Sequence, residues 1–131
     1  MKVFWAVAIG AGVGGLSRFY LAGFIQQRAG ADFPAGTLII NITGSFLVGF
    51  IMRIALQSDI ISAETRTLLT TGFCGGYTTF STFTYETALM VDDGEYSRAA
   101  LYVGASLVIG VVAMYLGFAV ANRLLALRQH V

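Results

Sequence analysis

Four long apolar segments, separated by short polar stretches, fill most of this chain of 131 residues. They run over residues 3–27, 36–56, 67–90 and 99–125. Each approaches or exceeds the roughly 20 residues that a helix needs to cross the core of a bilayer. The sequence therefore predicts an all-α membrane protein in which four transmembrane helices form a single four-span domain over residues 1–131.

The composition agrees with a location in a lipid bilayer. Hydrophobic residues make up 56% of the chain and charged residues only 11%, whereas a soluble domain carries roughly 25% charged residues. The net charge of +1 gives no basic surface for nucleic acid. The residues also supply no combination of nucleophile, base and orienting group. We therefore expect a multi-pass membrane protein that is not an enzyme and binds no nucleic acid.

The positive charges are unequally distributed between the two sides of the predicted membrane domain. The side that carries both termini has five basic residues: Lys2, Arg53, Arg66, Arg123 and Arg128. The other side has two, Arg28 and Arg98, or three if the side chain of Arg18 snorkels toward it. The positive-inside rule then favours cytoplasmic termini.

The third apolar segment contains a stretch, from Gly72 to Glu86, that is unusual for a transmembrane helix. The adjacent Gly75 and Gly76 weaken a helix, and Ser and Thr hydroxyls interleaved with aromatic rings follow them. Backbone that is not helical survives at membrane depth only where it is buried in protein or lines a cavity. We therefore predict a break at the glycine pair, in mid-membrane, and a candidate ion or substrate site beside it.

Side chains near this stretch favour a small anion over a cation. Phe80 and Phe83 are three residues apart and share a helix face, and the positive edges of their rings can face an anion. The alternative for this pair is ordinary packing between helices. Asn41, in the second segment, offers two amide donors, and its alternative role is an interhelical hydrogen bond.

Four further polar residues lie in or near the spans. Tyr102 and Ser106 share a face of the fourth segment, although a tyrosine at such a position is often an interfacial anchor. Glu86 suits either proton coupling or an interhelical hydrogen bond. Thr37 is expected to bond its own helix backbone, which is the commoner outcome.

Small residues recur at a spacing of four, which lets helices approach closely in lipid. The pairs are Gly10 and Gly14, Gly72 and Gly76, Ser45 and Gly49, and Ser106 and Gly110. Four helices of this size enclose little space alone, so a pore requires an oligomer, for which a twofold dimer is the default. Backbone carbonyls at the break, paired across such an axis, would suit a monovalent cation.

Three stretches together resemble the Fluc family, the small bacterial fluoride channels that are also called CrcB proteins. They are GTLIINITG at residues 36–44, GFCGGYTTFSTF at residues 72–83, and Tyr102 to Ser106. The resemblance also covers the chain length and the number of spans. It implies an antiparallel, dual-topology homodimer with two pores, which exports fluoride passively across the bacterial inner membrane.

The resemblance also implies roles for individual residues. Phe80 and Phe83 would place ring edges along the fluoride path, and Asn41 would donate a hydrogen bond to the ion. Arg18 would line an aqueous vestibule. A polar track would extend the path through five further side chains, Ser81, Thr82, Glu86, Tyr102 and Ser106.

The same resemblance implies one bound metal ion. A structural Na⁺ would sit at the centre of the dimer. The carbonyl oxygens of Gly75 and Thr78 from both subunits would hold it.

Two other functions stay open as alternatives. A small multidrug-type exporter that couples transport to protons has a similar size, but it needs a membrane-embedded carboxylate in the first helix, and this chain has none there. A non-conducting scaffold subunit is the second alternative, and it gives no reason for the hydroxyl-rich break.

Overall fold

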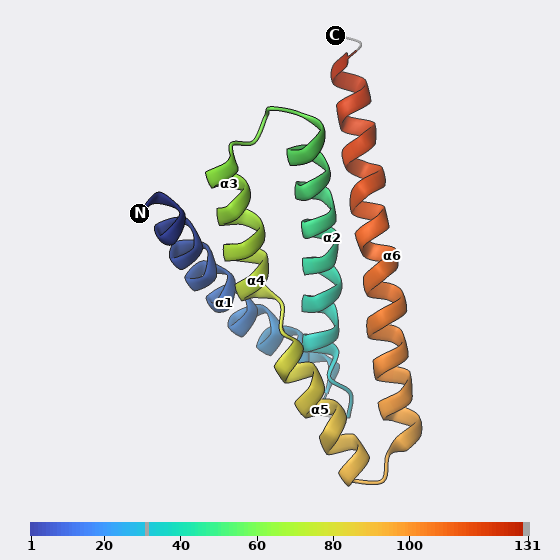
Figure 1. The fold of residues 1–131 in the computed structure, drawn as a ribbon. Coiled ribbons are helices and arrows are strands. Elements are labelled where there is room, and N and C mark those ends of the chain that lie inside the picture. The colour runs from blue at the N-terminus through green and yellow to red at the C-terminus, as the bar shows by residue number, and fades with distance from the viewer. Residues whose placement is uncertain (31, 130–131) are drawn as a thin grey trace.

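The computed structural model of the protein describes residues 1–30 and 32–129, and these ranges contain helices and no strand (Figure 1). The all-α class predicted from the sequence is therefore confirmed. The elements in chain order are α1 (Lys2–Ala29), α2 (Ala35–Gln57), α3 (Ala63–Thr67), the π-helix η1 (Leu68–Cys74), α4 (Gly75–Tyr77), α5 (Phe80–Asp92) and α6 (Tyr96–Gln129).

Within the described ranges, three helices, α1, α2 and α6, are long and apolar enough to cross a membrane. Each extends slightly beyond one of the predicted apolar segments. The third predicted segment is not one continuous helix, because α3, η1 and α4 follow one another over residues 63–77 and α5 begins only after an extended step. In Figure 1, α5 continues at an angle to the stretch formed by α3, η1 and α4, and it leads to the turn before α6.

The helix break lies after the glycine pair rather than at it. Gly75 and Gly76 belong to α4, and Gly75 has ordinary helical dihedral angles of φ −63° and ψ −38°. The backbone becomes extended at Thr78 (φ −83°, ψ 160°) and Thr79 (φ −149°, ψ 118°). The predicted break at the glycines is therefore wrong. Gly76 serves a helix contact instead, since a Cβ on it would lie 2.5 Å from the carbonyl oxygen of Ala11 in α1.

Glycines bring the helices close together at two crossings. A Cβ on Gly14 of α1 would lie only 2.1 Å from the carbonyl oxygen of Phe73 in η1. Helices α2 and α6 run side by side in the same direction (Figure 1), and a Cβ on Gly49 would lie 2.4 Å from the carbonyl oxygen of Met114. Both contacts bear out the close packing that the spacing of small residues predicts.

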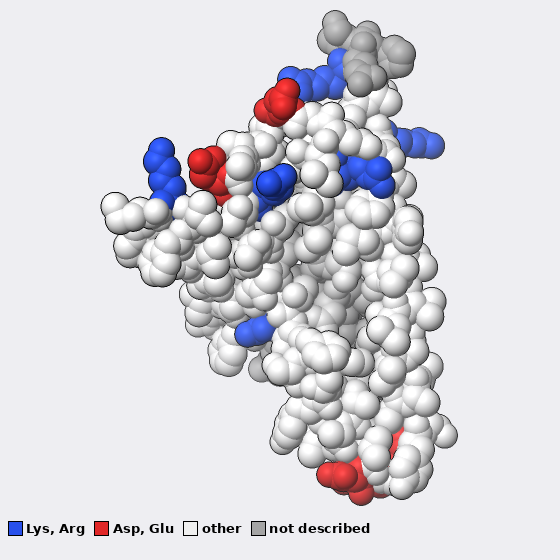
Figure 2. Space-filling model, in the orientation of Figure 1, with Lys and Arg blue, Asp and Glu red and all other residues white. Residues whose placement is uncertain are grey.

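The outer surface is largely apolar, as a lipid-facing surface requires. Phe4, Phe19 and Leu116 are exposed by 67%, 72% and 55%. Figure 2 shows charged side chains gathered at the two ends of the visible face, with a band of mostly uncharged residues between them. Apolar helices with charges at their ends are typical of a membrane protein.

Candidate functional site

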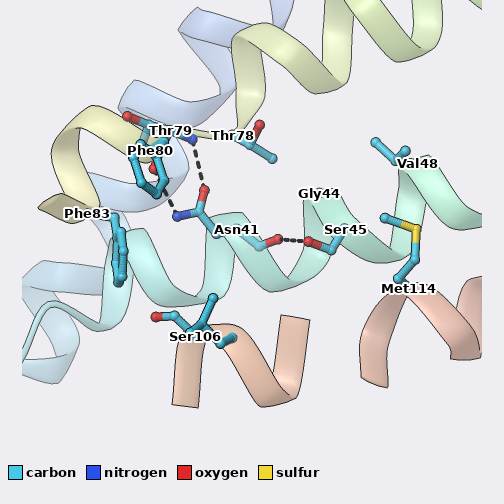
Figure 3. Close-up of a pocket in the computed structure, with 11 residues that line it drawn as sticks. Asn41, Gly44, Ser45, Val48, Thr78, Thr79, Phe80, Phe83, Ser106 and Met114 are labelled. Carbon is cyan, nitrogen blue, oxygen red and sulfur yellow. Dashed lines mark hydrogen bonds between the residues drawn. The ribbon is translucent and has the colours of Figure 1, made fainter. Parts of the chain in front are cut away.

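A groove of about 300 Å³ lies beside the helix break (Figure 3). It brings together four residues predicted for the site, Asn41, Phe80, Phe83 and Ser106, which come from α2, α5 and α6. The complete lining is Asn41, Gly44, Ser45, Val48, Thr78, Thr79, Phe80, Phe83, Ser106, Leu107 and Met114. The groove is thus mainly apolar, with a small number of polar groups at one end.

Asn41 joins α2 to the break through two hydrogen bonds with one residue. Its Nδ2 donates to the carbonyl oxygen of Thr79 at 3.0 Å, and the N–H of Thr79 donates to its Oδ1 at 2.8 Å (Figure 3). The interhelical bond considered for Asn41 is therefore present. Because a carboxamide nitrogen carries two protons, one N–H of Asn41 is not used by Thr79 and is a donor for the groove.

Ser106 contributes a second polar group to the groove. Its Oγ is buried and has no hydrogen-bond partner among the described residues. A buried hydroxyl without a partner costs about 1–3 kcal/mol. The groove therefore holds an atom that a bound water or ion would satisfy.

Side chains hold the extended backbone at Thr78 and Thr79 in place. The Oγ1 of Thr79 caps α5 by accepting from the N–H of Thr82 at 3.2 Å. The guanidinium of Arg18, from α1, donates to the carbonyl oxygen of Thr78 at 3.0 Å. Arg18 therefore does not snorkel toward a span end, because its donor satisfies a carbonyl that the break has released from helical bonding. Its positive charge lies beside the break.

Beyond Phe83, next to the groove, Tyr102, Glu86 and Thr37 form a polar cluster. The ring of Phe83 lies 5.2 Å, centroid to centroid, from that of Tyr102, which is fully buried. The Tyr102 hydroxyl donates to Oε2 of Glu86 at 2.6 Å, and Thr37 Oγ1 donates to Oε1 at 2.8 Å. The alternative of Tyr102 as an interfacial anchor is wrong, because its hydroxyl is held inside the protein. Glu86 has the interhelical role considered for it.

The predicted site residues at the start of α5 lie at the rim of the groove or outside it. Phe80 lines it but is 76% exposed, and its ring centroid lies 5.8 Å from that of Phe83. Ser81 and Thr82 are exposed and do not line the groove. Their hydroxyls lie 3.4 Å and 2.9 Å from Thr79 Oγ1, so they extend the polar surface of the break outward.

Comparison with known proteins places the chain in a family. A family profile described as CrcB-like protein, Camphor Resistance (CrcB), matches residues 5–118. The chain belongs to the CrcB family.

Relatives of similar length share nearly half of the sequence. A protein of Geobacter sulfurreducens is 44% identical over 95% of this chain and 100% of its own length. One of Acidobacterium capsulatum is 43% identical over 96% of this chain and 100% of its own length. Both are named fluoride-specific ion channel FluC. These names are names of channels, which confirms the expectation that this CrcB protein is not an enzyme.

The carboxyl end of α4 has oxygens that suit a hard cation. In a continuous helix the N–H of Thr79 would bond the carbonyl of Gly75, but here it donates to Asn41 instead. Gly75 is exposed, and Arg18 occupies one lone pair of the Thr78 carbonyl and leaves the second. Hard cations favour carbonyl oxygens, and a helix carboxyl end favours positive charge. The donor set thus fits Na⁺, although one chain supplies only part of a coordination shell.

Two contributors to the site were missed by sequence reasoning. Thr37 bonds Glu86 rather than its own helix, and its position four residues before Asn41, on the same face of α2, was an available signal. Gly44 lets the break approach α2, since a Cβ there would lie 2.2 Å from Cγ2 of Thr78. Only the position of the break reveals that second role.

Proposed function

We propose that this CrcB protein is a fluoride-selective channel that exports cytoplasmic fluoride by passive, electrodiffusive conduction and so lowers fluoride toxicity. The observation that carries the proposal is the groove at the break, where donors from separate helices face aromatic walls within an apolar chain. The names of relatives that this chain matches over their whole length, one of them 44% identical, support fluoride as the ion.

The groove offers what a small, strongly hydrated anion needs. A channel must replace the ion's hydration shell and still bind it weakly enough to release it. The free N–H of Asn41 and the hydroxyl of Ser106 are neutral donors, so they replace water without trapping the ion. The positive ring edges of Phe80 and Phe83 would add weak contacts along the same wall.

The path would continue past Phe83 into the polar cluster. Tyr102 and Glu86 lie next along it, and their mutual hydrogen bond gives the carboxylate one of its two donors. At the break itself, Ser81 and Thr82 supply hydroxyls on the outer side. The fixed charge of Arg18 beside Thr78 would raise the local concentration of anions in a vestibule.

We infer that the working unit is an antiparallel, dual-topology homodimer with one pore for each groove. Phe80 is 76% exposed, and Ser81 and Thr82 expose hydroxyls beside a broken helix, where contact with lipid would be costly. A second copy would cover them, and twofold dimers are the commonest closed assembly. An inverted copy would also pair the end that carries five basic residues with the end that carries two. The bacterial inner membrane is the expected location.

We also infer a structural Na⁺ at the dimer centre. The carbonyl oxygens of Gly75 and Thr78 from two subunits would together give four oxygen ligands. The ion would offset the partial negative charge at the carboxyl ends of two α4 helices. It would act as a fixed structural element, not as a transported ion.

Fluoride efflux from liposomes that carry the purified protein tests the proposal. We expect rapid fluoride release at a fluoride electrode, no chloride release under the same conditions, and no dependence on a proton gradient. Release that requires a proton gradient would favour the exporter alternative. No release from a folded dimer would favour the non-conducting scaffold and contradict the channel.

A further inference from the structure

The carboxamide of Gln26 makes three hydrogen bonds to the described backbone between the end of α1 and the start of α2. Its Nε2 donates to the carbonyl oxygens of Gly30 at 2.6 Å and Phe33 at 2.9 Å. Its Oε1 accepts from the N–H of Gly36 at 3.1 Å. Gln26 is in the last turns of α1, so a single residue fixes both ends of the connection.

The bond to Gly36 replaces a missing helix cap. The first N–H groups of a helix lack partners within the helix, and a side chain at the N-cap position usually satisfies one of them. The N-cap of α2 is Pro34, which makes no side-chain cap bond. Gln26 therefore caps α2 from another helix. Close packing of Gly36, where a Cβ would lie 2.5 Å from the carbonyl oxygen of Ala22, holds the two helices at that distance.

Phe33, whose carbonyl oxygen accepts from Gln26, is in direct contact with the polar cluster. The ring of Phe33 packs edge to face on Tyr102, with centroids 5.5 Å apart and an interplanar angle of 84°. Phe83 touches the same tyrosine at a centroid distance of 5.2 Å. Tyr102 is thus held between the connection and the wall of the groove, with its hydroxyl on Glu86.

Gln26 also lines a second pocket of about 380 Å³ on the outer side of this cluster. Glu86 is part of its lining, so the cluster separates this pocket from the groove at the break. The remaining charged groups of the lining are Asp32, Asp93, Glu95 and Arg98. With Glu86 the pocket has four carboxylates and one guanidinium, so it is an acidic opening whose charge does not concentrate anions.

We propose that Gln26 is a positioning residue for ion flow: it seats Phe33 on Tyr102, so that the Tyr102 hydroxyl stays on Glu86. This inference rests on the proposed fluoride channel. Without the Gln26 bonds, the carbonyl of Phe33 would keep only its bond from the N–H of Ala35, and the ring of Phe33 would be held less firmly on Tyr102.

Fluoride efflux from liposomes, measured for Gln26→Leu and for Gln27→Leu, tests this role. Gln26→Leu keeps the size of the side chain and removes all three bonds, and we expect fluoride flux to fall about five- to tenfold. The matched control, Gln27→Leu, changes an exposed neighbour on α1 and should keep wild-type flux. Equal flux from both variants would overturn the inference. If the wild-type protein itself releases no fluoride, the proposed function fails instead.

A double-mutant cycle with Tyr102→Phe separates positioning from general stability. If Gln26 acts through the Tyr102 hydroxyl, Gln26→Leu should change flux less than about twofold in the Tyr102→Phe background. The same fold loss in both backgrounds would overturn the inference. Phe33→Leu, which keeps apolar bulk and removes the ring contact, is a second variant if Gln26→Leu does not assemble. It should show the same loss and the same dependence on Tyr102, and an additive loss from it would equally refute the role.

Discussion

Asn41 is the residue whose substitution tests the site most sharply, because its carboxamide has two tasks. Two of its hydrogen bonds fix the backbone of Thr79, and one N–H is left for the groove. Asn41→Asp keeps the oxygen that accepts from Thr79 and removes both donors. Asn41→Leu removes the accepting oxygen and both N–H donors.

The magnitudes follow from the bonds that are lost. Thr79 is only 9% exposed, so its released backbone groups have little access to water. Each unsatisfied buried group costs about 1–3 kcal/mol, which gives about 1–3 kcal/mol for Asn41→Asp and about 2–6 kcal/mol for Asn41→Leu. Asn41→Asp also places a carboxylate where an anion should pass. An added barrier of about 1.4 kcal/mol for the anion lowers flux tenfold, and we expect the negative charge in the groove to raise the barrier by at least that much while the dimer still assembles.

Three measurements separate these effects. Efflux at a fluoride electrode gives the flux, size-exclusion chromatography gives the assembly, and fluorescence of the single tryptophan, Trp5, follows unfolding. Asn122→Asp, at an exposed position of α6, is the matched control and should leave all three unchanged. Wild-type flux from an assembled Asn41→Asp dimer would refute the role of Asn41 in the path.

Three further predictions concern the aromatic wall, the helix packing and the metal ion. Phe80→Ile should strongly reduce fluoride efflux without loss of the dimer, and unchanged efflux would exclude ring-edge contacts. Gly49→Ala should destabilise the fold by about 1–3 kcal/mol in thermal unfolding, whereas Gly104→Ala, with open space around its Cα, should not; equal unfolding would contradict the close contact. Replacing Na⁺ by a large organic cation during reconstitution should abolish efflux, and full activity without Na⁺ would count against a structural sodium site.

The sequence predicted the helices well because hydropathy is a strong signal over twenty residues. The position of the break was harder to predict. Adjacent glycines weaken a helix, but Gly75 and Gly76 stay helical, and Gly76 is where α1 packs at close range. The backbone opens at Thr78 and Thr79 instead, where Arg18 and Asn41 satisfy the released groups. A helix break forms where side chains distant in the sequence can bond the backbone groups that the break releases. The local sequence does not show which side chains those are.

For the site residues too, the sequence predicted the kind of side chain but not its hydrogen-bond partners. The pattern of hydroxyls, amides and rings indicated an anion path, because those groups are donors without fixed charge. It did not show which donors are already occupied. Asn41 bonds the break and Tyr102 bonds Glu86, so much of the polar lining is engaged in structure. The free N–H of Asn41 and the unpartnered Oγ of Ser106 are what the groove can offer an ion.

This division of tasks shows how the proposed anion path could be built from so few residues. A continuous helix exposes no backbone groups, so a site in mid-membrane must either break a helix or bury a charge. Here the break is stabilised by Arg18 from α1 and Asn41 from α2, and Asn41 also lines the groove. Rigidity and donor supply are therefore coupled, so a substitution that removes a structural bond at Asn41 also changes the donors that an ion would meet. That coupling is why flux and stability must be measured on the same variants.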